Sequence, residues 1–124
     1  MPWKVLLTCE DYFPHIGGAE VCVYNLRSEL TLLGHTVTVF TNTMQTTPDE
    51  RGIVRVHWRF TPRGLLRNVR ILWRLIGEAD IVHCHDWMTY EAATRTARAK
   101  GKPLVAHIHA TELDRTNFHP HQWI

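Results

Sequence analysis

The sequence predicts an α/β domain with a Rossmann-like, mainly parallel sheet and flanking helices. Two observations lead to this prediction. Short apolar runs of strand length alternate with amphipathic stretches of helical spacing almost throughout the 124 residues, as in sheets built from strand–helix–strand units. Several runs are apolar at nearly every position, which suits strands buried on both faces of a parallel sheet. One modest domain is therefore expected, spanning residues 1–124.

The first strand is expected at residues 3–9, the apolar run WKVLLTC. Residues 19–33 repeat apolar side chains at helical spacing and predict a helix, and Gly34 ends it because glycine readily forms a helix stop. The apolar positions that recur at this spacing are Val21, Tyr24, Leu26, Leu30 and Leu33. The β-branched residues 36–41 predict the second strand.

The remaining elements continue this alternation. They are expected to be a strand at 53–60, a helix at 64–77, a strand at 80–85, a helix at 89–100 and a strand at 103–109. The apolar face of the helix at 64–77 is formed by Leu65, Leu66, Val69, Leu72, Trp73 and Ile76. Residues 111–124 show no periodicity, and half of a doubly wound domain needs further elements, so we expect the domain to be truncated at its C-terminus.

The composition argues against several classes of protein. With 44% hydrophobic and 21% charged residues, the chain has the composition of an ordinary globular protein. It contains no run of about 18 apolar residues and no signal-peptide pattern, so we expect it in the cytoplasm. Its cysteines, Cys9, Cys22 and Cys84, are scattered in apolar runs, which argues against a disulfide framework and favours buried thiols.

Positive charge is unevenly distributed, although the formal net charge is only +2. Seven arginines and no acidic residue lie between positions 51 and 77. These arginines are Arg51, Arg55, Arg59, Arg63, Arg67, Arg70 and Arg74. The simplest interpretation is a sheet-covering helix with a solvated basic face. Nucleic acid is not expected as a partner, because no nucleic-acid-binding motif accompanies the charge.

Two adjacent glycines, Gly17 and Gly18, separate the first strand from the first helix in the stretch FPHIGGAE. A helix N-terminus exposes backbone amides and the positive end of the helix dipole, and residues without a Cβ atom let an anion approach closely. The pair therefore suits a phosphate. It also suits a plain turn, since the complete GxGxxG pattern of dinucleotide-binding folds is absent.

Two His-x-His pairs occur at the ends of expected strands, in HCHDW at 83–87 and in HIHAT at 107–111. Side chains two apart on a strand share one face, and ligands of α/β folds bind beyond the carboxyl ends of the strands. One interpretation is a metal site, with Asp86 or Asp114 completing the ligands. The other is a metal-free site in which histidines donate hydrogen bonds to a hydroxyl-rich substrate or to a developing charge.

The position of each histidine within its strand separates core candidates from site candidates. His83 and His107 lie further into the strands and are expected in the core, whereas His85 and His109 at the strand ends favour a site. His15, in the glycine-containing loop, is expected to face the same site at the carboxyl ends of the strands.

Two long stretches resemble the N-terminal domain of retaining GT-B glycosyltransferases. They are EDYFPHIGGAEVCVYNLRSELTLLGHTVTVFTN and DIVHCHDWMTYEAATRTARAKGKPLVAHIHATELDR. The resemblance extends from about residue 4 to residue 123 and is greatest to the glycogen-synthase and sucrose-synthase-like branch of glycosyltransferase family 4, a relative of phosphatidylinositol mannosyltransferases and N-acetylglucosaminyltransferases. It implies the acceptor-side half of an enzyme that transfers a sugar from a nucleotide-sugar donor.

The resemblance also implies roles for individual residues. The FPP-x-x-GG-like loop, which approaches the donor's diphosphate, corresponds to Phe13, Pro14, Gly17 and Gly18. The acceptor side of the cleft corresponds to His85, Asp86 and Trp87, with His15 beside it. The catalytic contact to the donor sugar corresponds to His109. The supporting loop corresponds to Thr111, Glu112, Asp114 and Arg115.

Partners follow from the resemblance as well. The nucleotide pocket and the paired-glutamate motif of such enzymes belong to a C-terminal nucleotide-binding domain, in the same or a separate chain, so this chain alone is expected to be inactive. The acceptor is expected to be a sugar, a glucan or a lipid, and no metal cofactor is expected. Residues 51–74 imply a weak peripheral contact with a membrane surface, as in membrane-associated relatives.

Two alternative functions remain open. One is a non-catalytic subunit that docks a separate donor-binding chain. The other is a metal-dependent hydrolase built on the two His-x-His pairs. Co-purification with a nucleotide-binding partner would favour the former, and stoichiometric zinc or iron would favour the latter.

Overall fold

The computed structural model describes residues 2–9, 12–14, 16–42, 44–56, 62–85 and 87–107. Its centre is a five-stranded parallel sheet with the strand order β3-β2-β1-β4-β5. The strands are β1 (Lys4–Cys9), β2 (Thr36–Thr41), β3 (Ile53–Arg55), β4 (Ile81–His85) and β5 (Leu104–His107), and the helices are α1 (Gly18–Leu32), α2 (Pro62–Glu78) and α3 (Trp87–Ala99). The predicted Rossmann-like α/β fold is confirmed.

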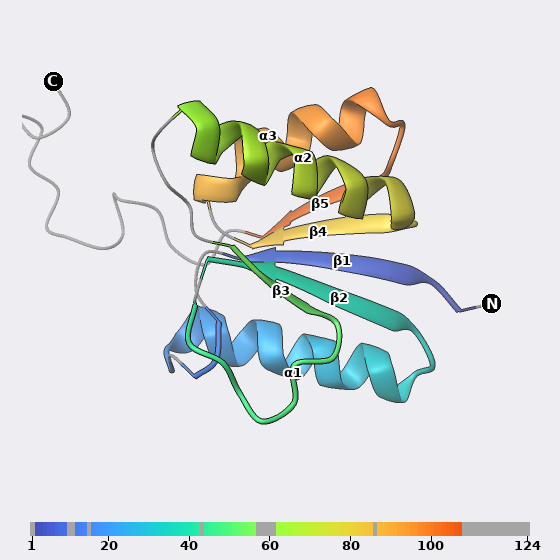
Figure 1. Cartoon of the computed structure of the whole chain (residues 1–124). Coiled ribbons are helices and arrows are strands. Elements are labelled where there is room, and N and C mark those ends of the chain that lie inside the picture. Colours follow the sequence, from blue (N-terminus) through green and yellow to red (C-terminus); the bar gives the residue numbers. More distant parts are fainter. Residues whose placement is uncertain are drawn as a thin grey trace, which may run out of the picture.

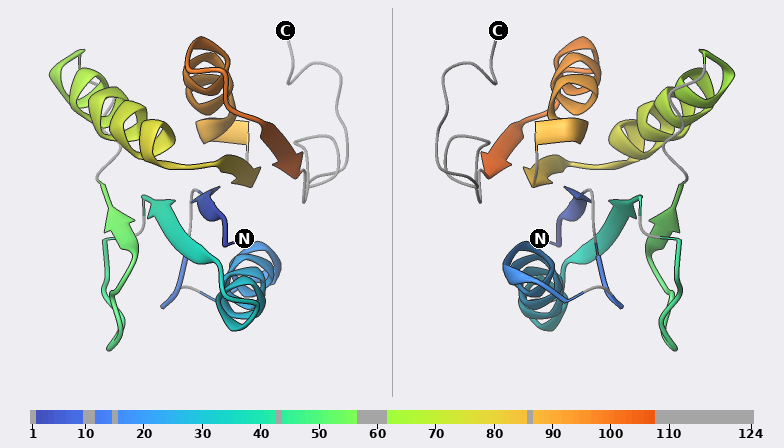
Figure 2. Two further views of the ribbon diagram at one scale, coloured as in Figure 1. Left: turned by 90° about the vertical axis from the view of Figure 1, so that its right-hand side faces the viewer. Right: turned by 90° about the vertical axis from the view of Figure 1, so that its left-hand side faces the viewer.

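The helices divide between the two faces of the sheet. α1 covers one face, and α2 and α3 lie together on the other (Figure 1). Figure 2 shows this three-layer arrangement along the direction of the strands. Alternate side chains of each strand therefore enter two separate cores. Val5, Leu7 and Val39 pack in the core on the α1 side, whereas Leu6 and Val82 pack in the core under α2 and α3.

β3 is shorter than predicted: it ends at Arg55, and residues 57–60 of the predicted strand lie outside the described residues. β5 is described as far as His107, and residues 108 and 109 of the predicted strand lie outside the described residues. The other elements agree with the predicted bounds to within two residues at each end, which is the usual uncertainty of element boundaries.

α1 buries part of its predicted apolar set. Leu26 and Leu30 pack against the core together with the fully buried Val23. Val21, Tyr24 and Leu33 are exposed. Apolar residues occur on more than one side of this helix, so their spacing alone does not decide which side meets the sheet. Contact with the sheet decides it.

The predicted end of α1 is confirmed. Gly34 follows the last turn with a φ of 94°, in the left-handed region that favours glycine. Its amide donates to the carbonyl of Thr31, and the amide of His35 donates to the carbonyl of Leu30, both at 3.0 Å. This pair of bonds is a Schellman motif, which satisfies carbonyls that the helix itself leaves without partners.

α2 buries only part of its predicted apolar face. Leu72 and Ile76 are fully buried, as predicted, but Leu66, Val69 and Trp73 are exposed at 53%, 38% and 46%. The outer surface of α2 therefore mixes apolar side chains with arginines. No helix in the described part of the chain is both long and apolar enough to cross a membrane.

Arg55 ties the end of β3 to the loop that precedes α1. Its side chain is 6% exposed and forms a bidentate ion pair with Glu50, with N–O distances of 2.6 and 3.0 Å. The same guanidinium donates to the carbonyl of Phe13 at 2.8 Å. Arg55 is therefore a buried structural residue, and it does not belong to the exposed basic face that the sequence suggested for this region.

Glu50 should make folding stability depend on pH. The hydrogen bond from Arg55 lowers the pKa of the Glu50 carboxyl from 4.5 to about 2. The unfolded chain thus takes up the proton at a higher pH than the folded chain, so the stabilisation from this pair is complete above about pH 4.5 and disappears as the pH falls to about 2. In urea unfolding, Glu50→Gln should lose about 1.5 to 3 kcal/mol at pH 7 and show a weaker pH dependence across this range.

Asp49→Asn is the matched control for this prediction. The hydrogen bond from Arg51 also lowers the pKa of Asp49 to about 2, but Arg51 is 91% exposed. Solvent and salt screen such a pair, so the control should lose less stability than Glu50→Gln. If the Glu50→Gln protein were as stable as the parent at pH 7, the ion pair between Arg55 and Glu50 would not contribute to folding stability.

Candidate functional site

The strand order reverses beside β1, and this reversal places two loops at one point. β1 pairs with β2 on one side and with β4 on the other, where Thr8 lies beside Cys84. The chain after β1 carries the glycine pair, and β4 ends at His85. Ligands of parallel α/β folds bind beyond the carboxyl ends of the strands at such a reversal. The structure therefore brings the predicted phosphate loop to the same edge as one predicted acceptor residue.

The N-terminus of α1 makes this edge partly positive. All three helices begin at the edge where the strands end (Figure 1). α1 starts at the glycine pair, with Gly17 as its N-cap in an extended conformation (φ −157°, ψ −179°). The first amides of a helix lack intrahelical partners, and the helix dipole adds partial positive charge there. This edge consequently favours an anionic group.

The two glycines differ in their surroundings. A Cβ atom at Gly17, the N-cap of α1, would meet the carboxylate of Glu20, which ends a flexible side chain and can move aside. A side chain at Gly18 would meet nothing within 4 Å, and its backbone is not in the left-handed region. Neither crowding nor backbone strain among the described residues thus requires glycine at position 18. The position is open, so another group could approach the backbone of Gly18 closely.

Aromatic stacking holds the loop before the glycines against α1. The ring of Phe13 stacks on Tyr24 with 4.3 Å between centroids, and on Tyr12 with 5.7 Å. Stacked aromatic pairs add to the energy of burial. Together with the hydrogen bond from Arg55 to the Phe13 carbonyl, the stack sets the course of this loop. The spacing of apolar residues in the sequence does not reveal this stack, because it joins a loop residue to a helix residue.

A cavity of about 320 Å³ lies beside the same loop. Its walls include Tyr12, Phe13, Tyr24, Arg27 and Asp49. Ring faces combined with a few polar groups are typical of small-molecule sites. The cavity therefore offers a place for a polar ligand between the loop before α1 and the middle of that helix.

Three histidines meet on the α1 side of β4 and β5. The rings of His83 and His85 stack with 4.1 Å between centroids. The ring of His107, which lies opposite His85 in register, is 5.6 Å from His83 and 5.1 Å from His85. The predicted convergence of these side chains on one face of the sheet is confirmed for these three residues.

The burial of these histidines differs from the predicted one. His85 is fully buried, His83 is half-buried and His107 is exposed. The expectation that His107 belongs to the core is wrong, because β5 is an edge strand and α1 packs mainly on β1 and β2 on this face. His85, which was expected at an open strand end, lies beneath the surface.

A cysteine that the sequence did not single out lies beside the histidines. Cys22 of α1 offers its Sγ atom, and His85 and His107 each offer a ring nitrogen, with all three atoms within 4.8 Å of one another. All three cysteines are free thiols, as expected. The sequence does hold a signal that could have identified Cys22. It lies one turn after Gly18, near the end of α1 that lies at the site.

Most of the other predicted site residues lie outside the described residues. These are His15, Asp86, His109, Thr111, Glu112, Asp114 and Arg115. For Trp87 the structure describes the backbone, as the first residue of α3. The roles assigned to these residues stay predictions.

Comparison with known proteins agrees with the resemblance. The model of the family described as Glycosyltransferase Family 4 matches residues 16–124. An uncharacterized glycosyltransferase of Methanocaldococcus jannaschii is 26% identical over 127 aligned positions, which cover 90% of this chain and 32% of that protein. The chain thus spans about a third of the length of this curated relative.

A solved structure supports the fold. The C-terminal domain of a hydrogenase from Pyrococcus furiosus superposes with a TM-score of 0.54 at 14% identity, covering 84% of this chain and 90% of that one. At this identity the similarity concerns the fold alone. The family assignment rests instead on the match over residues 16–124, which includes the glycine pair and both His-x-His pairs. The chain belongs to glycosyltransferase family 4.

Proposed function

We propose that this chain is the acceptor-side domain of a retaining glycosyltransferase that transfers a sugar from a nucleotide-sugar donor. Family membership supports the general activity. The observation that carries the finer proposal is Gly18, which has open space before it at the N-terminus of α1. Departure of a nucleoside diphosphate builds negative charge on phosphate oxygens, and fixed amides and a helix dipole stabilise that charge.

In this proposal the residues around the edge divide into a donor side and an acceptor side. Gly17 and Gly18 receive the donor's diphosphate, and His109 contacts the donor sugar at the reacting centre. Its loop is shaped by Thr111, Glu112, Asp114 and Arg115. Asp86, Trp87 and His15 face the acceptor. His85 acts as a positioning residue, because its buried ring fixes the end of β4 from which Asp86 follows.

The cavity beside Phe13 is our candidate for part of the acceptor site. Its aromatic rings and the charged groups of Arg27 and Asp49 suit a sugar, a glucan end or a polar lipid headgroup.

The nucleotide would be bound by a C-terminal domain in the same or a separate chain. That the chain spans only 32% of its curated relative supports a further domain. Membership of a glycosyltransferase family argues against a metal-dependent hydrolase.

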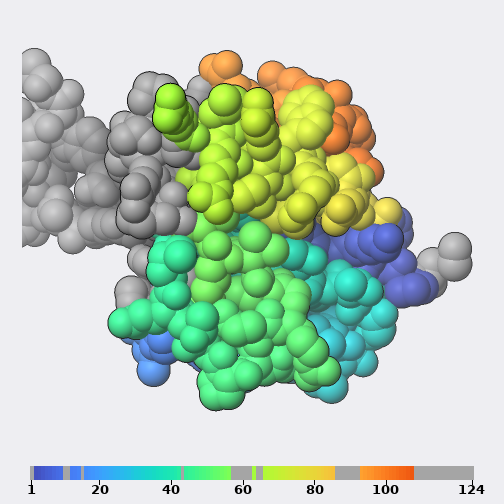
Figure 3. All heavy atoms as spheres, viewed as in Figure 1, coloured from blue at the N-terminus to red at the C-terminus, as the bar shows by residue number. Residues whose placement is uncertain are grey.

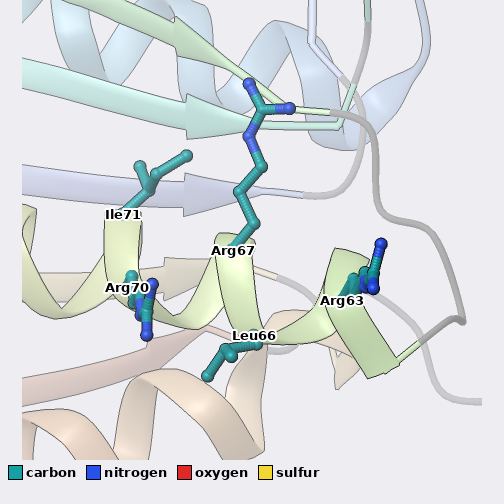
Figure 4. A pocket seen from close by; sticks show the side chains of 5 residues that line it. All are labelled: Arg63, Leu66, Arg67, Arg70 and Ile71. Carbon is teal, nitrogen blue, oxygen red and sulfur yellow. The ribbon is translucent and has the colours of Figure 1, made fainter.

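The outer surface of α2 supports a further proposal, a peripheral contact with anionic lipid. α2 lies at the surface in the space-filling view (Figure 3). A shallow hollow of about 390 Å³ runs along it, lined by Arg63, Leu66, Arg67, Arg70 and Ile71. Figure 4 shows that the three arginines leave the helix in different directions, which spreads their charge over the surface. Exposed Leu66, Val69 and Trp73 lie among them, and such a mixture is typical of helices that lie on membranes.

Gly18→Ala should separate ligand binding from folding. Alanine fits the described structure, because a Cβ atom at this position meets nothing within 4 Å, and it suits a helix better than glycine. Thermal unfolding should therefore be unchanged or slightly raised. In the complete enzyme the KM for the nucleotide sugar should rise at least about tenfold, as expected when one favourable contact of about 1.4 kcal/mol is lost.

Gly17→Ala serves as the comparison for Gly18→Ala. The Glu20 carboxylate ends a flexible side chain and can move aside for a methyl group at position 17. Alanine is a poorer N-cap than glycine, however, so this variant should lose stability as well as donor affinity. An unchanged KM in a folded Gly18→Ala enzyme would remove the assigned phosphate contact.

His109→Ala tests the catalytic role implied by the family resemblance. Loss of one preorganised hydrogen-bond donor at a reacting centre typically lowers kcat by about 100-fold to 1,000-fold. We expect a loss of this size in the complete enzyme, with the same unfolding temperature as the parent. Turnover equal to that of the parent would refute the role. His35→Gln, at a histidine far from the strand ends that build the site, is the matched control and should retain activity.

Vesicle binding tests the α2 surface. The chain should co-sediment with vesicles that contain phosphatidylglycerol, bind pure phosphatidylcholine far less, and dissociate in high salt. Each basic side chain near an anionic surface contributes about 1 kcal/mol. The double variant Arg67→Gln with Arg70→Gln should therefore bind about 30-fold more weakly. The double variant Lys4→Gln with Arg51→Gln has the same net charge but leaves α2 intact, and equal weakening in both would contradict the proposed surface.

A further inference from the structure

Cys22, His85 and His107 form a cluster of metal-ligating side chains, of which only His85 has a part in the proposed transfer reaction, as a positioning residue. They come from α1, β4 and β5, which are far apart in the sequence, yet their ligand atoms lie within 4.8 Å of one another. We propose that this cluster binds a divalent metal ion of the zinc type, and that the ion ties α1 to β4 and β5.

The donor set indicates the class of metal. A cysteine thiolate and two imidazoles are ligands of zinc and its neighbours in the first transition row, whereas magnesium and calcium prefer oxygen. Cys22, His85 and His107 supply one sulfur and two nitrogens. Three protein ligands leave a fourth tetrahedral position for solvent or another residue. The charge of the ion would be partly neutralised by the thiolate.

The spacing of the ligand atoms is close to that of an occupied site. Zinc–sulfur bonds of about 2.3 Å and zinc–nitrogen bonds of about 2.0 to 2.1 Å place tetrahedral ligands about 3.3 to 3.6 Å apart. The three atoms lie within 4.8 Å of one another. Closure by at most about 1.5 Å is therefore needed, which side-chain rotation can supply without a change of backbone.

The surroundings orient the ligands and leave a route for the ion. His85 is fully buried, and its ring is held by stacking on His83 at 4.1 Å. Supporting contacts of this kind fix a metal-binding imidazole in place. Cys22 is half-buried and His107 is exposed, so the cluster is dry on one side and open to solvent on the other.

An ion here would stabilise a part of the fold that packing holds weakly. α1 packs mainly on β1 and β2, so apolar contacts join it to one half of the sheet. Cys22, His85 and His107 would join it to the other half. Gly18 lies one turn before Cys22, so the ion would also steady the turn that carries the proposed phosphate contact. The two proposals can nevertheless fail separately, because metal binding is measured without any transfer reaction.

Cobalt(II) titration tests the site directly. The full chain is prepared without a histidine tag, reduced, stripped with chelator and titrated with cobalt(II) as a coloured substitute for zinc. We expect one equivalent to bind, with intense thiolate-to-cobalt absorption in the near ultraviolet and visible bands of tetrahedral coordination. One equivalent of zinc should remove both signals. Zinc should also raise the unfolding temperature, since the assembled site exists only in the folded chain.

Three variants locate the ion. Cys22→Ser should abolish the thiolate band, and His107→Gln should weaken cobalt binding by about 100-fold or more. Cys84→Ala is the matched control: it removes a thiol between His83 and His85 in the sequence, but Cys84 faces the core under α2 and α3. This control should keep the full band. Circular dichroism of the metal-free proteins identifies any variant that fails to fold, and His107→Gln, at an exposed position, is the least prone to this.

The outcomes that overturn the proposal are equally distinct. Binding well below one equivalent would do so. Cobalt that binds without a thiolate band would place the ion on surface histidines. A band that survives Cys22→Ser, or one that Cys84→Ala removes, would assign the ion to another thiol.

Discussion

The parallel pairing of every strand around β1 is the constraint on which the rest of this structure depends. A chain that pairs strands in parallel must return to the opposite edge of the sheet after each one. All strands therefore end, and all three helices begin, at the same edge. Because β1 pairs with both β2 and β4, the loop before α1 and the end of β4 meet at the centre of that edge. The site is a consequence of this topology.

The start of α1 combines features that suit an anion with one that opposes it. α1 begins without a side-chain cap at Gly17, and the first acidic residue, Glu20, lies with its carboxylate beside Gly17. A negative group in the first turn offsets the helix dipole. In front of Gly18 the space stays open. The Phe13–Tyr24 stack and the Arg55 hydrogen bond hold the preceding loop, so the open position is part of an ordered structure.

The arginines illustrate how one residue type acquires different roles. Arg55 is buried in a bidentate pair with Glu50, whereas Arg51 forms its pair with Asp49 almost entirely in solvent. The Arg55 pair organises the loop beside the site, whereas the exposed Arg51 pair contributes little to folding stability. On α2, Arg67 and Arg70 lie exposed among apolar side chains. Their spacing in the sequence is similar, so only the surroundings of each guanidinium distinguish structural from surface roles.

Local patterns in the sequence determined the strands, the helices, the stop at Gly34 and the gathering of the glycine pair and the histidines at one edge. These features depend on periodicity, on backbone preferences of single residues and on the rules of parallel sheets, all of which act over short stretches. Only the tertiary structure decided that Val23 is the buried residue of α1, that His85 is buried while His107 is exposed, and that Cys22 lies beside both. Burial and contact depend on which segments meet across the sheet and on which strand lies at its edge, and these pairings join residues that are distant in the sequence.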